Sequence, residues 1–138
     1  MRTLIASLTA TLVFFACGSA RGASAPGAEV RELLRQPFPE KPGTDVVTLE
    51  VIYPPGGATP PHEHPGYVYA YVLAGAVVSQ VGKPPAHTFA QGQMWSELPY
   101  QHHMVSKNAS STQPAKLLVF LIVPHTAQLT TFLAPSAK

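Results

Sequence analysis

The chain has 138 residues, nine basic and seven acidic side chains, a formal net charge of +2 and one cysteine, Cys17. This length corresponds to a single domain that can bury a sizeable core. One cysteine excludes an internal disulfide framework and a thiolate metal site, and the small net charge gives no indication of a nucleic-acid-binding surface.

Residues 1–23 are typical of a secretory signal peptide. Arg2 supplies a short positive start, and an apolar stretch over residues 4–16 precedes a run of small residues. This stretch is too short for a comfortable membrane span, and cleavage after Ala20 or after Ala23 fits the small-residue pattern. We therefore expect an exported protein, either periplasmic or secreted.

A lipoprotein signal is the alternative interpretation of the same segment. In that case Cys17 would carry a lipid and hold the protein at a membrane, but the residues before it fit such a signal poorly. Removal of an ordinary signal also removes Arg2 and Arg21, which leaves seven basic side chains against seven acidic ones. The mature chain is then electrically balanced.

Residues 24–45 are expected to form a lead-in to the main domain. The sequence GAEVRELLRQP, residues 27–37, predicts a short amphipathic helix that ends at its proline, with Val30, Leu33 and Leu34 on one face. The turn-rich sequence FPEKPG follows and connects the helix to the next segment.

From residue 46 the pattern changes to short strands separated by Pro- and Gly-rich turns. The strand-like segments are VVTLEVIY, YVYAYVLAG, AVVSQV, HTFA, QMWSEL, HMVSKN and AKLLVFLIV. Short strands at this spacing are typical of an antiparallel sandwich or barrel. We expect an all-β fold, with a single antiparallel β-barrel or jelly roll over residues 46–123 and a C-terminal arm or edge strand over residues 124–138.

Two histidines stand one residue apart in the sequence PPHEHPG. Residues i and i+2 of a strand face the same side, so His62 and His64 converge while Glu63 points away. Converging imidazoles hold first-row transition metals, although a pair of exposed polar residues at a loop edge is the plain alternative. A third ligand is available where His102 and His103 adjoin the strand-like sequence HMVSKN, and only one of these two can face the interior.

The histidines and the glycines around them make the chain resemble the cupins, small β-barrels with two sequence motifs. In the first motif Gly56 precedes His62 by five intervening residues, His64 follows, and Gly75 closes the motif. The chain departs from the family at Val68, or at Tyr69 with the longer of the two motif spacings, where the motif has a glutamate that binds metal.

The second cupin motif is matched by Gly92, His103 and Asn108. Here Leu98 and Tyr100 replace the usual proline and glycine, so the register of this motif is less well determined.

The resemblance implies a three-histidine site for one divalent transition metal, formed by His62, His64 and His103. A register shifted by one residue would place His102 in the site instead of His103. Of the two, His103 is the favoured ligand. Iron, zinc, manganese or nickel would suit such a site, and three neutral imidazoles would leave the ion its full positive charge. A barrel whose histidines no longer bind metal is the alternative.

Glu97 is the candidate catalytic residue, because it lies on the strand-like segment before His103. If it faces inward it is a substitute ligand or a general base whose pKa is raised by burial, and if it faces outward it is a solvated strand residue. The alternation along the segment leaves both possibilities open.

The ligand and partner are indicated only broadly. Arginine does not occur after Arg35, which counts against bidentate binding of a carboxylate or phosphate and favours a neutral or aromatic small molecule. If Val68 faces inward, Tyr67, Tyr69 and Tyr71 share the outer face, and such a stripe predicts a homodimer surface.

Two functions fit these expectations. One is an exported cupin that binds a small molecule at a metal without catalysis, and the other is an iron-dependent dioxygenase or another small-molecule oxidoreductase. The resemblance does not decide between them, because the cupin fold hosts isomerases, decarboxylases, dioxygenases and seed storage proteins. We favour binding and leave enzyme activity open.

Overall fold

The computed structural model describes residues 27–134, and this part of the chain forms strands and no helix. The expected signal peptide and Cys17 lie outside the described residues. Within the described range, no helix is long and apolar enough to cross a membrane. The strands are β1 (Glu29–Pro37), β2 (Thr44–Tyr53), β3 (Ala58–Thr59), β4 (His62–Glu63), β5 (Tyr67–Ala74), β6 (Ala76–Val81), β7 (His87–Ala90), β8 (Met94–Glu97), β9 (His103–Asn108), β10 (Ala115–Pro124) and β11 (Thr131–Phe132).

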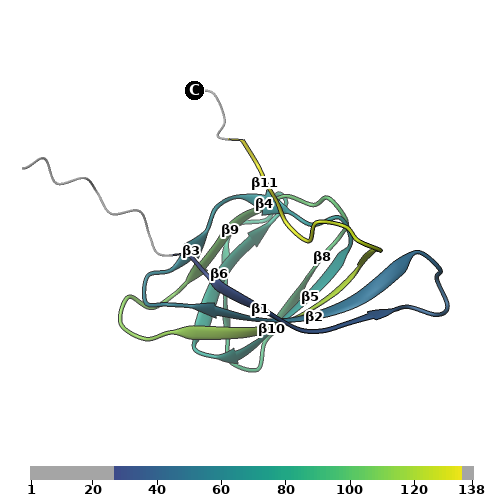
Figure 1. Cartoon of the computed structure of the whole chain (residues 1–138). Helices are drawn as coiled ribbons and strands as arrows, with labels where there is room; N and C mark the ends of the chain where they lie inside the picture. The colour runs from purple at the N-terminus through teal and green to yellow at the C-terminus, as the bar shows by residue number, and fades with distance from the viewer. Residues whose placement is uncertain (1–26, 135–138) are drawn as a thin grey trace, which may run out of the picture.

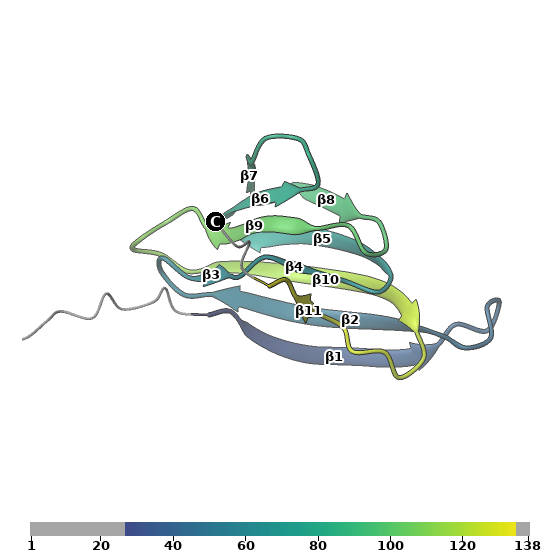
Figure 2. The ribbon, with the colours of Figure 1, turned by 90° about the horizontal axis from the view of Figure 1, so that it is seen from above.

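The strands form two antiparallel sheets that enclose one interior (Figures 1 and 2). The five-stranded sheet has the order β1-β2-β10-β5-β8, and the six-stranded sheet has the order β11-β4-β9-β6-β7 with β3 beside β9. Neighbouring strands in each sheet are mostly distant in sequence, as in a jelly roll. The expected all-β barrel is confirmed.

The core follows from strict alternation along the central strands. In β5, Val68, Ala70 and Val72 are almost fully buried while the residues between them are exposed. The same alternation on β2 and β10 directs a row of aliphatic side chains into the barrel. One apolar face per strand is how an antiparallel sheet buries a core and keeps its other face toward water. The interior is therefore largely aliphatic before any functional residue is considered.

The prediction of a short helix over residues 27–37 is wrong, because Glu29–Pro37 forms strand β1. It pairs with the edge of β2 from Glu29 to Pro37, and the register shifts between Glu32 and Leu34. A bulge inserts one extra residue and breaks the period of two, so the apolar side chains acquire a spacing that resembles that of a helix. The five-stranded sheet therefore includes part of the expected lead-in.

Gly66 sets how closely β5 can begin beside β10. A Cβ at this position would overlap the carbonyl oxygen of Ile122 and crowd the backbone of Val123. Only glycine fits such a close approach of two backbones. Gly66 lies two residues after His64, so this close approach of the two strands directly follows the first histidine pair in the sequence.

The tyrosine stripe lies on the outer face of the five-stranded sheet, as expected. Tyr67, Tyr69 and Tyr71 are each about two-fifths exposed, and Phe120 lies beside Tyr69 on β10. The face is apolar and aromatic, which is typical of a protein contact surface. A homodimer formed through it stays a prediction.

Candidate metal centre

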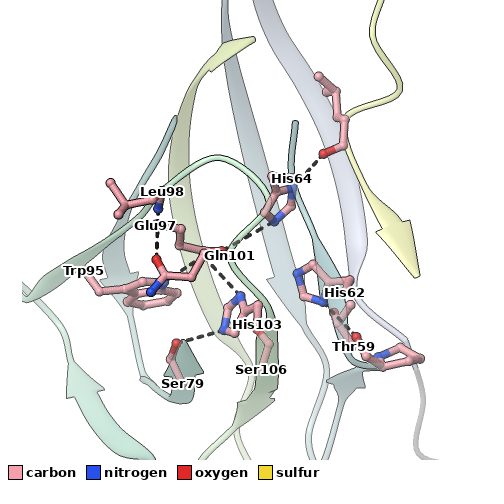
Figure 3. A network of polar contacts seen from close by, with 12 residues as sticks. Thr59, His62, His64, Ser79, Trp95, Glu97, Leu98, Gln101, His103 and Ser106 are labelled. Atoms are coloured by element: carbon pink, nitrogen blue, oxygen red, sulfur yellow. Dashed lines mark hydrogen bonds and ion pairs between the residues drawn. The ribbon is translucent and has the colours of Figure 1, made fainter. Parts of the chain in front are cut away.

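Three histidines from two chain segments converge inside the barrel (Figure 3). His62 on β4 and His103 at the start of β9 are direct cross-strand partners, and His64 follows one residue after β4. The ring centroid of His62 lies 4.9 Å from that of His64 and 4.8 Å from that of His103. One nitrogen from each ring lies within 4.8 Å of the others. The structure thus brings together the three histidines that the sequence predicted as ligands.

Backbone carbonyls fix which nitrogen of His62 and His64 is free. Nδ1 of His62 donates to the carbonyl oxygen of Pro60 at 2.7 Å, and Nδ1 of His64 donates to that of Leu129 at 2.6 Å. A carbonyl oxygen can only accept, so Nδ1 carries the proton in both rings and Nε2 keeps its lone pair. A metal-binding histidine is held in the same manner by an acceptor behind its ring.

His103 is oriented by a different partner. Its Nε2 shares a hydrogen bond of 2.8 Å with the hydroxyl of Ser79 on β6. Its Nδ1 is buried and has no hydrogen-bond partner among the described residues. The side chain is only 3% exposed. One ring nitrogen is therefore anchored, and the other is left to face the remaining groups of the centre.

Burial keeps His62 in the neutral form that a metal requires. Desolvation lowers its pKa to about 4, with further contributions from the charges of His103 and His64, while the hydrogen bond to Pro60 acts in the opposite direction. Imidazole must be unprotonated to donate a lone pair to a metal. At neutral pH His62 is therefore ready to bind an ion.

Glu97 faces inward, which settles the question that the sequence left open. It is 3% exposed, and its Oε1 accepts a hydrogen bond of 3.0 Å from the indole Nε1 of Trp95. Oε1 lies 3.1 Å from Nδ1 of His103, and Oε2 lies 3.9 Å from Nε2 of His64. Glu97 is thus the carboxylate of the histidine cluster.

The pKa of Glu97 differs from expectation. Burial alone raises it, as the sequence analysis assumed, but close contact with His103, the charge of His64 and the hydrogen bond from Trp95 together lower it below its ordinary value. The side chain is therefore ionised at neutral pH, and its negative charge faces three imidazoles. A carboxylate in this form can bind a cation or accept a proton.

The other histidines lie outside the cluster. The side chain of His102 is 59% exposed and lies 3.5 Å from the carboxylate of Glu63 on the outside of the barrel. His87 is exposed against Phe89, and His125 pairs with Asp45 at 2.9 Å. Their positions leave His103, rather than His102, as the third member of the centre.

A cavity of about 90 Å³ adjoins the histidines. Its walls are mostly aliphatic side chains of β2, β5 and β10, with Tyr53, Thr59 and Ser106 as additional polar groups. Tyr53 already shares hydrogen bonds with Ser106 at 2.8 Å and Thr59 at 2.7 Å. The cavity therefore has one end that can bind a metal and an apolar remainder, and it is far smaller than the roughly 300–1,000 Å³ of drug-sized pockets.

The C-terminal segment covers the histidines and was missed as part of the site. Strand β11 pairs with β4, so that Phe132 is the cross-strand neighbour of His62, and the Leu133 N–H donates to the Pro61 carbonyl at 2.9 Å. The same segment supplies the Leu129 carbonyl that holds His64. A backbone carbonyl has no sequence signature, so only the structure reveals this role.

The donor set fits a divalent transition metal. Nε2 of His62 and of His64 and Nδ1 of His103 make no hydrogen bond within the described residues, and the buried carboxylate of Glu97 lies 3.1 Å from Nδ1 of His103 and 3.9 Å from Nε2 of His64. Two ligands of one ion lie roughly 3.0–4.2 Å apart for metal–ligand distances of about 2.0–2.2 Å. Small rotations of the three rings would therefore close the observed cluster around an ion.

Comparison with known proteins agrees with this geometry. The Cupin domain family profile matches residues 49–121, which is more than half of the chain. The chain belongs to the cupin family. A search of curated protein sequences finds no match.

Several solved structures share the cupin fold. A recombinant oxalate oxidase in complex with glycolate is 21% identical with a TM-score of 0.60, over 80% of this chain and 57% of that chain. DMSP lyase DddQ from Ruegeria pomeroyi is 18% identical with a TM-score of 0.58, over 67% and 45%. An uncharacterized double-stranded β-helix protein from Klebsiella pneumoniae is 19% identical with a TM-score of 0.57, over 82% and 90%. This cupin spans only about half of the oxidase and lyase chains, and the likeness establishes the fold.

The first prediction concerns the ligands. Replacing both His62 and His64 with alanine should abolish stoichiometric metal binding, because two of three nitrogen donors are lost. His103→Ala should weaken Zn²⁺ affinity by more than about tenfold, whereas His102→Ala should leave it nearly unchanged. Titration with Zn²⁺ against a chromophoric chelator measures both. A larger loss in the His102 variant would contradict this assignment of ligands.

The second prediction concerns the C-terminal segment. Deleting residues 128–138 removes the Leu129 carbonyl and β11, and it should lower metal affinity about 10–100-fold, the usual effect of losing the group that orients a histidine ligand. Deleting residues 135–138 alone is the matched control and should have no effect. Equal affinities for the two truncated proteins would show that the segment does not position His64.

The third prediction concerns acid stability of the metal-free protein. Since the pKa of His62 falls to about 4 from 6.5, the unfolded chain takes up a proton first as pH is lowered. The free energy of unfolding should therefore fall by up to about 3 kcal/mol between pH 6.5 and 4 because of this group. Urea unfolding of chelator-treated wild type and His62→Gln tests this, and the variant should show a shallower decline. Parallel pH profiles would contradict the assignment.

Proposed function

We propose that this chain is an exported cupin that binds one divalent transition metal through His62, His64 and His103 and holds a small molecule beside it. The observation that carries the proposal is the set of three converging imidazoles, each anchored on one side and free on the other. An anchored, neutral imidazole with a free lone pair is the form in which histidine binds metal. Export is supported by the signal-like sequence of residues 1–23.

The cavity favours a compact and uncharged ligand. Its volume of about 90 Å³ admits a molecule of few heavy atoms, and its aliphatic walls contact an apolar body. The described lining residues include no lysine or arginine that could neutralise a free carboxylate or phosphate away from the metal. A small molecule with one donor atom for the metal and an apolar remainder fits this environment best.

An iron-dependent dioxygenase or other oxidoreductase is the second candidate, and the position of Glu97 favours it. A buried ionised carboxylate beside the histidines could accept a proton from a bound substrate. When iron is bound, a site with open positions supplies redox chemistry with dioxygen. The oxalate oxidase with glycolate has a similar fold, which supports this second candidate at the level of the fold.

The fourth prediction is that mature protein, produced from residue 24 onward, contains close to one metal ion per chain. Elemental mass spectrometry measures this, with the His62→Ala/His64→Ala variant as the control. Absence of metal after loading with Fe²⁺, Mn²⁺ and Zn²⁺ would contradict the proposal. Oxygen uptake by the iron-loaded protein with small neutral and aromatic compounds then separates the two functions, because a binding protein consumes no oxygen.

A further inference from the structure

Glu97 has a more specific role than the cluster of histidines alone suggests. We propose that it is the fourth metal ligand, supplied from β8 rather than from β5. This inference rests on the proposed three-histidine centre and deepens it, because a carboxylate ligand changes both the charge of the site and the metals that it prefers.

The first argument is an unpartnered buried atom. Oε2 of Glu97 and Nδ1 of His103 are the buried side-chain polar atoms that lack a hydrogen-bond partner within the described residues. A buried carboxylate oxygen without a donor is costly, and such atoms in native structures require an explanation. Both atoms belong to one cluster, and Nδ1 of His103 lies 3.1 Å from Oε1 of Glu97 without forming a hydrogen bond. A cation bound by both side chains would satisfy both unpartnered atoms.

The second argument is the separation of the donor atoms. Nδ1 of His103 lies 3.1 Å from Oε1 of Glu97, and Nε2 of His64 lies 3.9 Å from Oε2. Both values fall in the roughly 3.0–4.2 Å range expected for two ligands of one ion with metal–ligand distances of about 2.0–2.2 Å. The carboxylate therefore already occupies a ligand's place relative to two of the imidazoles.

The third argument is that the carboxylate is held in place like a ligand. Trp95, two residues earlier on the same face of β8, donates its indole N–H to Oε1 at 3.0 Å. This hydrogen bond orients the group and does not involve Oε2, which is directed toward His64 (Figure 3). Carboxylates that bind metal are commonly held by a hydrogen bond from a neighbouring group in this way.

The register of the sheet explains how β8 can provide this group. Glu97 is the direct cross-strand partner of Val68 on β5, and both side chains line the cavity. Directly opposite residues have Cβ atoms only about 4.5–5.5 Å apart, so a carboxylate from either position reaches the same region. Val68 stands where the cupin motif has its glutamate, and Glu97 fills that region from the neighbouring strand.

A ligand role has a consequence for the choice of metal. Three imidazoles alone leave an ion's charge of +2 uncompensated, whereas Glu97 reduces it by one and supplies a hard oxygen donor. Carboxylate oxygen suits Mn²⁺ better than a site made only of nitrogen does. The affinity for Mn²⁺ should therefore depend strongly on Glu97.

The fifth prediction uses reciprocal exchange of the two side chains. Glu97→Gln and Glu97→Val should each lower Mn²⁺ affinity by more than about tenfold, since even a group behind a ligand is worth 10–100-fold. The exchange variant Val68→Glu/Glu97→Val should recover most of the affinity lost in Glu97→Val. The visible spectrum of bound Co²⁺ should change in Glu97→Gln, because the number of ligands changes.

Glu63→Gln is the matched control. Glu63 carries the same charge and lies next to two of the histidines in sequence, but it faces His102 outside the barrel. It should leave the Mn²⁺ affinity and the Co²⁺ spectrum unchanged. This variant separates loss of a ligand from loss of a nearby negative charge.

The outcomes distinguish this inference from the function on which it rests. An unchanged Co²⁺ spectrum and unchanged Mn²⁺ affinity in Glu97→Gln would overturn the ligand role and leave the three-histidine centre intact. Wild-type protein that binds neither ion would overturn the proposed function itself. If thermal unfolding shows that the exchange variant does not fold, Glu97→Gln still tests the ligand role, because glutamine keeps the shape of the side chain.

Discussion

The structure depends on enclosing four polar side chains in a largely aliphatic barrel, with His62, His103 and Glu97 buried and His64 partly buried. A buried polar group is costly unless it is hydrogen-bonded. Each of the four groups meets this requirement on one side only: two imidazoles donate to backbone carbonyls, the third is bonded to Ser79, and Glu97 accepts from Trp95. Their other polar atoms face one another. The barrel thus directs a set of donor atoms at one point. Packing of an apolar core does not require such a set.

This arrangement makes the C-terminal segment around β11 part of the centre. Strand β11 closes over β4, and its approach brings the Leu129 carbonyl to His64, sixty-five residues away in sequence. Pairing of β4 with β9 aligns His62 with His103. His62 and His103 lie on strands of the six-stranded sheet, whereas Glu97 lies on β8 of the five-stranded sheet. An ion bound by the histidines and Glu97 together would therefore link the two sheets, and metal binding is expected to stabilise the fold.

Much of the fold could be predicted from the sequence, because alternation along β5 and β10 is strong and the histidines fall at motif spacing. The helix predicted for residues 27–37 failed since a bulge in β1 altered the apolar period, and pairing with β2 overrode local preference. The inward direction of Glu97 was undecidable from its short strand alone. The role proposed for Glu97 depends on its pairing with Val68 on the neighbouring strand. No local sequence pattern encodes this strand register. The role of the Leu129 carbonyl could not be predicted from the sequence either, because every residue has a backbone carbonyl.

The cupin fold alone does not assign a reaction, and the site narrows the possibilities by its chemistry: a small, mostly apolar cavity with three nitrogen donors and one carboxylate at one end. The central claim is that these donors bind one metal ion. The most direct test is a crystal structure of the Mn²⁺-loaded protein with anomalous diffraction data that locate manganese. The account predicts a single strong peak within about 2.0–2.3 Å of His62, His64 and His103, with Glu97 in contact. Manganese absent from this point, or bound only at surface residues, would contradict it.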